Sequence, residues 1–271
     1  IIWFVIPVPA GVTANAWHLL ALFVATIAAI IGKAMPIGAL SIVAIALVAV
    51  TGVTNATPGG AIADALSSFA NPLIWLIGVS IMISRGIIKT GLGARIGYLC
   101  IAVWGKKTIG IAYSLALSEL ILAPVTPSNT ARGGGIIHPI MRAIAGSYDS
   151  DPEHGTQGRM GRFLALANYH ANPITSAMFI TATAPNPLIV KLIADTTGAQ
   201  ISLTWGTWAL AMLLPGLVAL ALMPLVVYWL NPPEIKSTPN AAQFARDRLR
   251  EMGPITRGEL IMLGVFGVLL V

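Results

Sequence analysis

The chain has 271 residues, of which 56% are hydrophobic and only 10% are charged, whereas soluble domains carry about 25% charged residues. This composition excludes a soluble globular domain, because the interior of such a domain could not bury so much apolar surface. The net charge of +6 comes from basic residues in short segments between apolar runs, and these residues form no single stripe. The sequence therefore predicts contact with membrane lipid and no nucleic-acid partner.

The apolar runs predict an all-α, polytopic membrane protein, because several approach the length of about 17 to 25 residues that a membrane-spanning helix needs. The first residue is Ile1, and the last apolar run, 260–271, has no flanking charge. Both ends are therefore expected to be truncated, with residues 1–9 as the remainder of a first span. The region 1–107 is predicted to hold two further spans, 17–32 and 36–53, and an interfacial helix over 85–107. The apolar run 71–84 between them is shorter than a full span unless 67–72 belongs to it.

In the region 108–206, polar residues interrupt two of the apolar runs. The run 109–125 meets a polar segment, 126–132, before a short apolar arm follows. This pattern predicts either a re-entrant helical hairpin or one broken span. A second span, which begins at Phe163, is interrupted at 181–187, and this predicts a discontinuous helix.

The last region, 207–271, is predicted to hold a span, a polar connector with a short amphipathic helix, and the start of a further span: 208–230, 231–257 with its helix around 241–251, and from Glu259 onward. If the connector and the segment 85–107 face the cytoplasm, fourteen of the sixteen basic residues lie on that side. Only Lys191 lies on the other side, and Arg132 remains inside the membrane. This distribution follows the positive-inside rule and predicts an integral protein of the bacterial inner (plasma) membrane.

The two interruptions predict a binding site for a small anion. Non-helical backbone is tolerated at membrane depth only where protein buries it or where it lines an aqueous cavity, and the N-termini of half-helices attract anions. Hydroxyl and amide groups at both interruptions can bind carboxylate oxygens: Ser128, Asn129 and Thr130 at the first, and Thr181, Thr183 and Asn186 at the second. The alternative is that these residues only cap ordinary helix kinks.

Arg132 is expected to have a specific partner, because an arginine at the bilayer centre costs at least about 2.5 kcal/mol. It neutralises a substrate carboxylate, forms a structural ion pair with Glu119, or extends to the membrane surface. Glu119, the only acid in the first arm of the hairpin, is either that structural partner or a proton-coupling group. The lone Cys100 and the scattered histidines predict no metal site and no catalytic site.

Three motifs resemble those of one known transporter family. They are Pro127-Ser-Asn-Thr-Ala-Arg132 with the glycines and His138-Pro-Ile140 that follow, Asn172-Pro-Ile-Thr-Ser-Ala-Met178, and Thr183-Ala-Pro-Asn-Pro187. Together they resemble the divalent anion/sodium symporter family, and the likeness extends over essentially the whole chain. Within that family the sequence is most similar to the bacterial citrate/succinate, tartrate/succinate and oxoglutarate/malate antiporters.

The resemblance implies an inverted-repeat fold, a homodimer, and an elevator-type motion of a transport domain that carries the hairpin. This chain would hold the N-terminal repeat and the start of the second, with 1–107 as a scaffold-type region and 108–206 as a transport-type region. The implied substrate-binding residues are Ser128, Asn129, Thr130, Thr183, Pro185 and Asn186, with Arg132 beside them. The cation-binding or charge-balancing residues are predicted to be Ser128, Asn129, Thr181 and Arg132. A second Ser-Asn-Thr motif, expected from the other repeat, is missing from the sequence, so these residues form half a site.

Arg132 departs from the pattern of the sodium-coupled members, which usually carry a small residue such as threonine at this position. Because a fixed positive charge could replace a bound sodium ion, the sequence predicts secondary active transport of di- or tricarboxylates by sodium-independent exchange. The alternative is a sodium-coupled dicarboxylate symporter, with Na⁺ as its only cofactor. An intramembrane enzyme would need a catalytic pair or metal triad, and a purely structural subunit would not need two polar helix breaks, so both are disfavoured.

Overall fold

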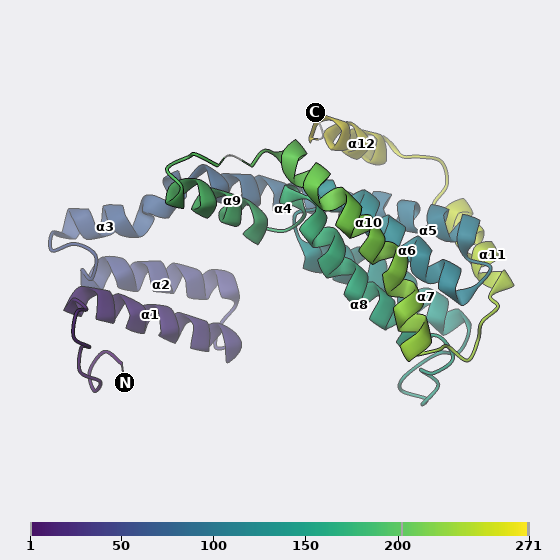
Figure 1. Ribbon diagram of the computed structural model, residues 1–271, viewed down its shortest axis with the longest axis horizontal. Coiled ribbons are helices and arrows are strands. Elements are labelled where there is room, and N and C mark those ends of the chain that lie inside the picture. Colours follow the sequence, from purple (N-terminus) through teal and green to yellow (C-terminus); the bar gives the residue numbers. More distant parts are fainter. Residues whose placement is uncertain (1, 202, 270–271) are drawn as a thin grey trace. The chain divides into compact units, whose positions relative to one another are not determined.

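The computed structural model describes residues 2–201 and 203–269. Residues 1 and 270–271, on which the prediction of truncated ends depends, lie outside this description. The described elements are all helical (Figure 1): α1 (Ala14–Ile31), α2 (Ile37–Thr51), α3 (Pro58–Leu66), η1 (Ser67–Ala70), α4 (Pro72–Thr90), α5 (Leu92–Trp104), α6 (Thr108–Leu122), η2 (Ala123–Val125), η3 (Thr130–Ile137), α7 (His138–Ser147), α8 (Gly161–Met178), η4 (Ile180–Ala182), α9 (Pro185–Thr196), α10 (Trp205–Leu230), α11 (Pro239–Glu251) and α12 (Arg257–Leu269).

The chain divides into two compact units, residues 1–75 and residues 76–271. In the first unit, α1 packs against α2, and α2 packs against α3. The buried apolar residues that the structure describes in this unit are few and mostly small: Ala21, Leu40, Val53 and Ala61. Its larger apolar side chains are mostly exposed, which suits helices whose solvent is lipid, because lipid tails are as apolar as leucine. The predicted scaffold and transport roles, divided at residue 107, remain predictions.

Three of the described helices are long and apolar enough to cross a membrane: α1, α6 with its continuation to Val125, and α10. A fourth span results if the helices Pro58–Ala70 and Ile74–Thr90, which a short break separates, count as one. The predicted spans at 17–32, 109–125 and 208–230 are therefore confirmed as membrane-length helices. The short amphipathic helix predicted around 241–251 is also confirmed, as α11.

Two further predicted spans form as helices but do not meet the length and hydropathy of a span. α2 is only 15 residues long, because Gly52 adopts a left-handed conformation with φ 63° that ends the helix. α8 has 18 residues, but polar side chains such as Asn168 and Asn172 lower its hydropathy. The polar face of α8 is part of the candidate site described below.

The prediction of one interfacial helix over 85–107 is wrong. α4 continues through Arg85 to Thr90, and Gly91, with φ 82°, separates it from α5. α5 then packs against α6 and α11. Arg95 is buried in an ion pair with Glu259 of α12, with 2.6 Å between Nε and Oε1. The sequence misleads here because an arginine paired inside the protein produces the same spacing as one that faces lipid headgroups.

The core of the second unit lies where α6, α8 and α10 pack together (Figure 1). α6 is the most enclosed of the three span-length helices. Of the apolar 18-residue stretch that qualifies each helix as a span, 61% is buried inside the protein in α6, against 22% in α10 and 6% in α1. Polar side chains of α6, including Glu119, therefore face protein and not lipid. This enclosure permits a buried charge on a membrane-length helix.

Gly110, in the first turn of α6, lies very close to the end of α5. A Cβ atom at this position would lie 2.1 Å from the carbonyl oxygen of Trp104. We expect Gly110→Ala to lower the free energy of unfolding by about 1–3 kcal/mol, because a backbone carbonyl cannot move aside as a flexible side chain can. Gly146→Ala in α7 is the control, since no atom lies within 4 Å of its added Cβ. Thermal unfolding in detergent measures both variants, and equal melting temperatures would contradict the expectation.

Candidate functional site

The first helix break lies between η2, which ends at Val125, and the π-helix η3, which begins at Thr130. Two side chains cap the new helix. The Oδ1 atom of Asn129 accepts a hydrogen bond from the backbone N–H of Thr130 at 2.8 Å, and the Ser128 hydroxyl accepts one from the N–H of Ala131 at 3.2 Å. The break falls where the sequence predicts it, and the side-chain oxygens of Ser128 and Asn129 serve as helix caps.

Other groups at this tip remain available to a ligand. The amide nitrogen of Asn129 donates to no acceptor within the described residues, and both Asn129 and Thr130 are exposed. They line a hollow of about 460 Å³ between the start of η3 and α8. Four further polar side chains line it: His138, Asn168, Tyr169 and Asn172. The buried Oδ1 atom of Asn168 has no hydrogen-bond partner among the described residues, so the hollow has unused polar groups.

The second helix break lies between α8, which ends at Met178, and α9, which begins at Pro185. α9 therefore begins inside the interruption predicted over 181–187, because proline is favoured at the first helical position. Asn186 is buried, and its amide nitrogen donates to the carbonyls of Ser176 at 2.8 Å and Phe179 at 2.9 Å. Both amide hydrogens of Asn186 thus connect the start of α9 to the end of α8.

The two breaks lie next to each other, because η2 packs against η4. The Thr181 hydroxyl donates to the carbonyl of Pro124 in η2, directly before the first break, and accepts from the indole N–H of Trp205 at 3.1 Å. Thr183 is half-buried and Pro185 is exposed. Within the described residues, those that line the hollow beside Thr130 are Asn129 and residues of η3, α7 and α8, and none comes from the second break.

Arg132 lies at the centre of a buried polar network. Neither its side chain nor that of Glu119 is exposed to solvent, and its Nε lies 2.6 Å from Glu119 Oε2. The remaining four donors also have acceptors: Nη1 donates to the carbonyls of Thr126 at 2.8 Å and Ala182 at 3.1 Å, and Nη2 donates to the hydroxyls of Thr175 at 3.3 Å and Ser176 at 2.8 Å. A guanidinium has five N–H donors, so all of them are used.

Of the alternatives for Arg132, the structure contains the ion pair with Glu119. Extension to the membrane surface is excluded, because the side chain has no exposed area. A direct contact with substrate would require one of the five hydrogen bonds to open. Arg132 also joins the two breaks, because its Nη1 atom donates to the carbonyl of Thr126 in the first and to that of Ala182 in the second.

Three residues of this network, Asn172, Thr175 and Ser176, are not singled out as site residues by sequence reasoning. The amide nitrogen of Asn172 lies 3.3 Å from both Glu119 oxygens and 3.0 Å from the carbonyl of Asn129. A Cβ atom on Gly133 would lie 2.7 Å from this nitrogen, so glycine permits the approach. The spacing of the three residues, i, i+3 and i+4, places them on one face of α8. That spacing is the signal that could have identified them.

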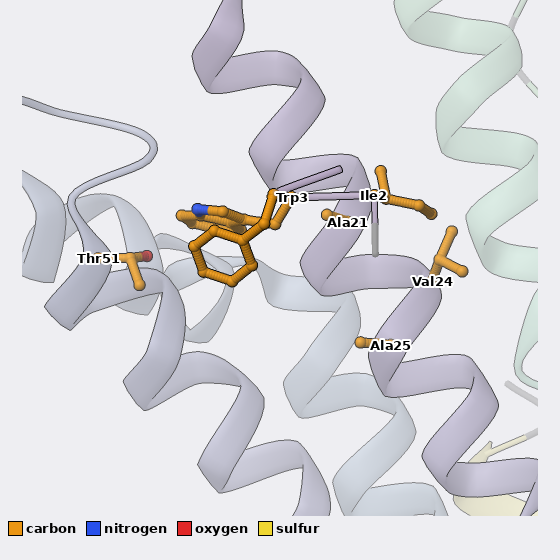
Figure 2. A pocket seen from close by; sticks show the side chains of 7 residues that line it. Ile2, Trp3, Ala21, Val24, Ala25 and Thr51 are labelled. Atoms are coloured by element: carbon orange, nitrogen blue, oxygen red, sulfur yellow. The ribbon is translucent and has the colours of Figure 1, made fainter. Parts of the chain in front are cut away.

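A second hollow, of about 670 Å³, lies in the unit of residues 1–75 and has a different character (Figure 2). Its labelled lining residues are Ile2, Trp3, Ala21, Val24, Ala25 and Thr51. Thr51 is the only one with a polar side-chain group apart from the indole of Trp3, and its hydroxyl donates to the carbonyl of Leu47 at 2.6 Å. No charged side chain lines this hollow in the described structure, so it does not suit an anion.

Comparison with known proteins supports the resemblance of the three motifs. The whole chain, residues 1–271, matches the family described as the sodium:sulfate symporter transmembrane region. It is 52% identical over 271 residues to "Putative malate transporter YflS" of Bacillus subtilis, a match that covers 100% of this chain and 55% of that protein. It is 42% identical over 262 residues to "Dicarboxylate transporter 1, chloroplastic" of Arabidopsis thaliana, covering 97% of this chain and 45% of the relative.

A third relative is "Inner membrane protein YbhI" of Escherichia coli, to which the chain is 40% identical over 261 residues, with 96% of this chain and 54% of that protein covered. The chain thus spans about half the length of the curated relatives it matches. Because the family model covers the entire chain and describes a transmembrane region, it agrees with the long apolar helices of the structure. This integral membrane protein belongs to the sodium:sulfate symporter family, the divalent anion/sodium symporters, which are transporters and not enzymes.

Proposed function

We propose that the full-length protein carries small dicarboxylates across the membrane by secondary active transport, and that the tip formed by Ser128, Asn129 and Thr130 meets a substrate carboxylate. The observation that carries this proposal is the exposed, unpaired amide nitrogen of Asn129 at the N-terminus of η3, beside a polar hollow, within the described structure. Helix N-termini favour anions. The names of the relatives, which include malate and dicarboxylate transporters, supply the substrate class.

The second break has two functions in this proposal. Of the four predicted site residues at this break, Thr183 and Pro185 carry no side-chain hydrogen bond in the described structure, and we assign them to the substrate. Asn186 and Thr181 are positioning residues, because their polar hydrogens are already donated to backbone carbonyls. They hold the breaks in place while other groups meet the substrate.

The hydrogen bonds of Arg132 to backbone carbonyls at the two breaks support sodium-independent exchange. Carbonyls at broken helices coordinate sodium in many transporters. Here the Arg132 guanidinium already donates to one carbonyl from each break, Thr126 and Ala182, so a built-in cation joins them. Glu119 neutralises its charge. We therefore assign Arg132 to holding the two breaks together, and we assign Glu119 to the structural pair and not to proton coupling.

The proposal includes the architecture that the family resemblance implies. This chain would supply the N-terminal repeat of an inverted-repeat fold, with α6, η3 and α7 as a re-entrant hairpin and α8 and α9 as the broken helix. The packing of η3 against α6 supports the hairpin. A homodimer and an elevator-type movement of the unit that carries both breaks complete the proposal.

Counterflow with the full-length protein in proteoliposomes tests this function. We expect uptake of radiolabelled malate to require malate or succinate inside the vesicles and to be the same with and without a sodium gradient. Uptake into vesicles without internal dicarboxylate, driven by external sodium, would show the alternative, a sodium-coupled symporter. If no dicarboxylate is transported under either condition, the proposed substrate class is wrong.

A further inference from the structure

Three lysines from two distant segments are brought together at the junction of α5 and α6. An antiparallel bridge pairs Lys107 with Ser237. On either side of it, the N–H of Thr238 donates to the carbonyl of Lys106 at 2.9 Å, and the N–H of Thr108 donates to the carbonyl of Lys236 at 3.1 Å. These bonds fix the backbone of Lys106, Lys107 and Lys236 in one place.

The positive charge at this junction is not neutralised within the described structure. Lys106, Lys107 and Lys236 are all exposed, and none forms an ion pair with a described acid. Glu234, two residues before Lys236, is the acid nearest to them in sequence, and it is not paired with any of them. Arg246 of α11 adds a further cation, because its Nη2 donates to the carbonyl of Ala102 near the end of α5, at 3.2 Å. An anionic partner is therefore expected.

An apolar groove of about 630 Å³ begins at two of these lysines, Lys106 and Lys107. Lys106 and Lys107 line it together with Val103, Trp104, Ile109, Tyr113 and Leu117, from the end of α5 and the start of α6. The Tyr113 hydroxyl is already bonded to the carbonyl of Ala221 at 2.6 Å, so the groove has little polar surface beyond its lysines. Val103 is 65% exposed and Trp104 is 51% exposed.

We propose that this groove, which we call the lysine groove, binds an anionic phospholipid of the surrounding bilayer. The phosphate would lie at the lysines and an acyl chain would lie along the apolar walls. A soluble anion would use the lysines but leave the groove empty, whereas a lipid matches both features. Basic pockets between membrane helices bind acidic headgroups, and tryptophan and tyrosine gather at the headgroup level. The proposal does not depend on the transport function.

Native mass spectrometry of the full-length protein in detergent tests the lysine groove. Titration with phosphatidylglycerol is compared with titration with phosphatidylcholine of the same acyl chains. We expect tighter binding of phosphatidylglycerol. The triple variant Lys106→Gln/Lys107→Gln/Lys236→Gln should lose about fivefold in affinity for each lysine removed, or about one hundredfold altogether. Lys33→Gln, which changes an exposed lysine in the other unit, is the matched control and should bind as the wild type does.

A second variant tests the apolar walls of the groove. Val103→Glu places a negative charge on the apolar wall, beside the proposed acyl chain, and should weaken phosphatidylglycerol binding at least about fivefold. The proposal is overturned if both lipids bind equally, or if the triple variant and Val103→Glu bind phosphatidylglycerol as the wild type does. It is also overturned if inorganic phosphate displaces the bound lipid at similar concentrations, because the site would then recognise a free anion.

Discussion

Replacing Arg132 with glutamine is expected to lower the free energy of unfolding by about 3–5 kcal/mol, because it leaves the Glu119 carboxylate buried without its partner. Both side chains have no exposed area, and 2.6 Å separates Arg132 Nε from Glu119 Oε2. Glutamine is also shorter than arginine, so its amide would end near the position of Nε and would not reach the carbonyls of Thr126 and Ala182 that Nη1 bonds, and this link between the two breaks would be lost. Chemical denaturation of the full-length protein in detergent micelles measures the loss.

Two further variants test whether the loss of stability comes from the buried ion pair. Lys191→Gln removes an ion pair with Asp195 whose side chains are 42% and 57% exposed, so it should cost less than about 1 kcal/mol. The double variant Arg132→Gln/Glu119→Gln should be more stable than the two single variants predict by addition, because neither partner is then left charged and unpaired. If Arg132→Gln costs no more than Lys191→Gln but abolishes transport, Arg132 acts on the substrate and not on the structure.

The positions of the helices could be predicted from the sequence better than their exact boundaries and the partners of their side chains. Apolar runs predict helices such as α1 and α10 because only a helix satisfies its backbone in lipid. The same rule predicts both breaks, where proline and polar residues interrupt such runs. The boundary at Gly91 could not be predicted, since a left-handed glycine leaves no mark on hydropathy. The partner of Arg95 could not be predicted either, because Glu259 lies 164 residues away in the chain.

The side-chain partners in the candidate site could also be predicted only in part. The two charges of the hairpin, Glu119 and Arg132, suggest a pair, because neither is stable alone at membrane depth. The pattern does not show that Thr175 and Ser176 use the remaining donors of Arg132, since hydroxyl residues are common in membrane helices. It also does not show that Asn186 faces the end of α8. Sequence can therefore name the groups at a helix break, but only the packing of α6 against α8 decides which groups are already bonded.

Replacing Asn129 with aspartate is expected to abolish binding of dicarboxylates and leave the fold unchanged. The Oδ1 atom of Asn129 caps η3 by accepting from the N–H of Thr130 at 2.8 Å, and an aspartate carboxylate caps a helix equally well. Unfolding free energy should therefore change by less than about 0.5 kcal/mol. The variant loses the amide donor and faces the substrate with a like charge. Since such a juxtaposition costs several kcal/mol, affinity should fall by about one hundredfold or more.

Asn129→Ala and Asn240→Asp complete the experiment. Asn129→Ala removes the cap and should cost about 1 kcal/mol of stability, whereas Asn240→Asp adds the same charge at an exposed position of α11 and should leave both properties unchanged. Binding of radiolabelled malate and thermal unfolding are measured for all three variants of the full-length protein. If Asn129→Asp binds malate as well as the wild type, the tip only caps a kink. The two roles of one side chain separate here because its oxygen faces the helix and its nitrogen has no protein partner among the described residues.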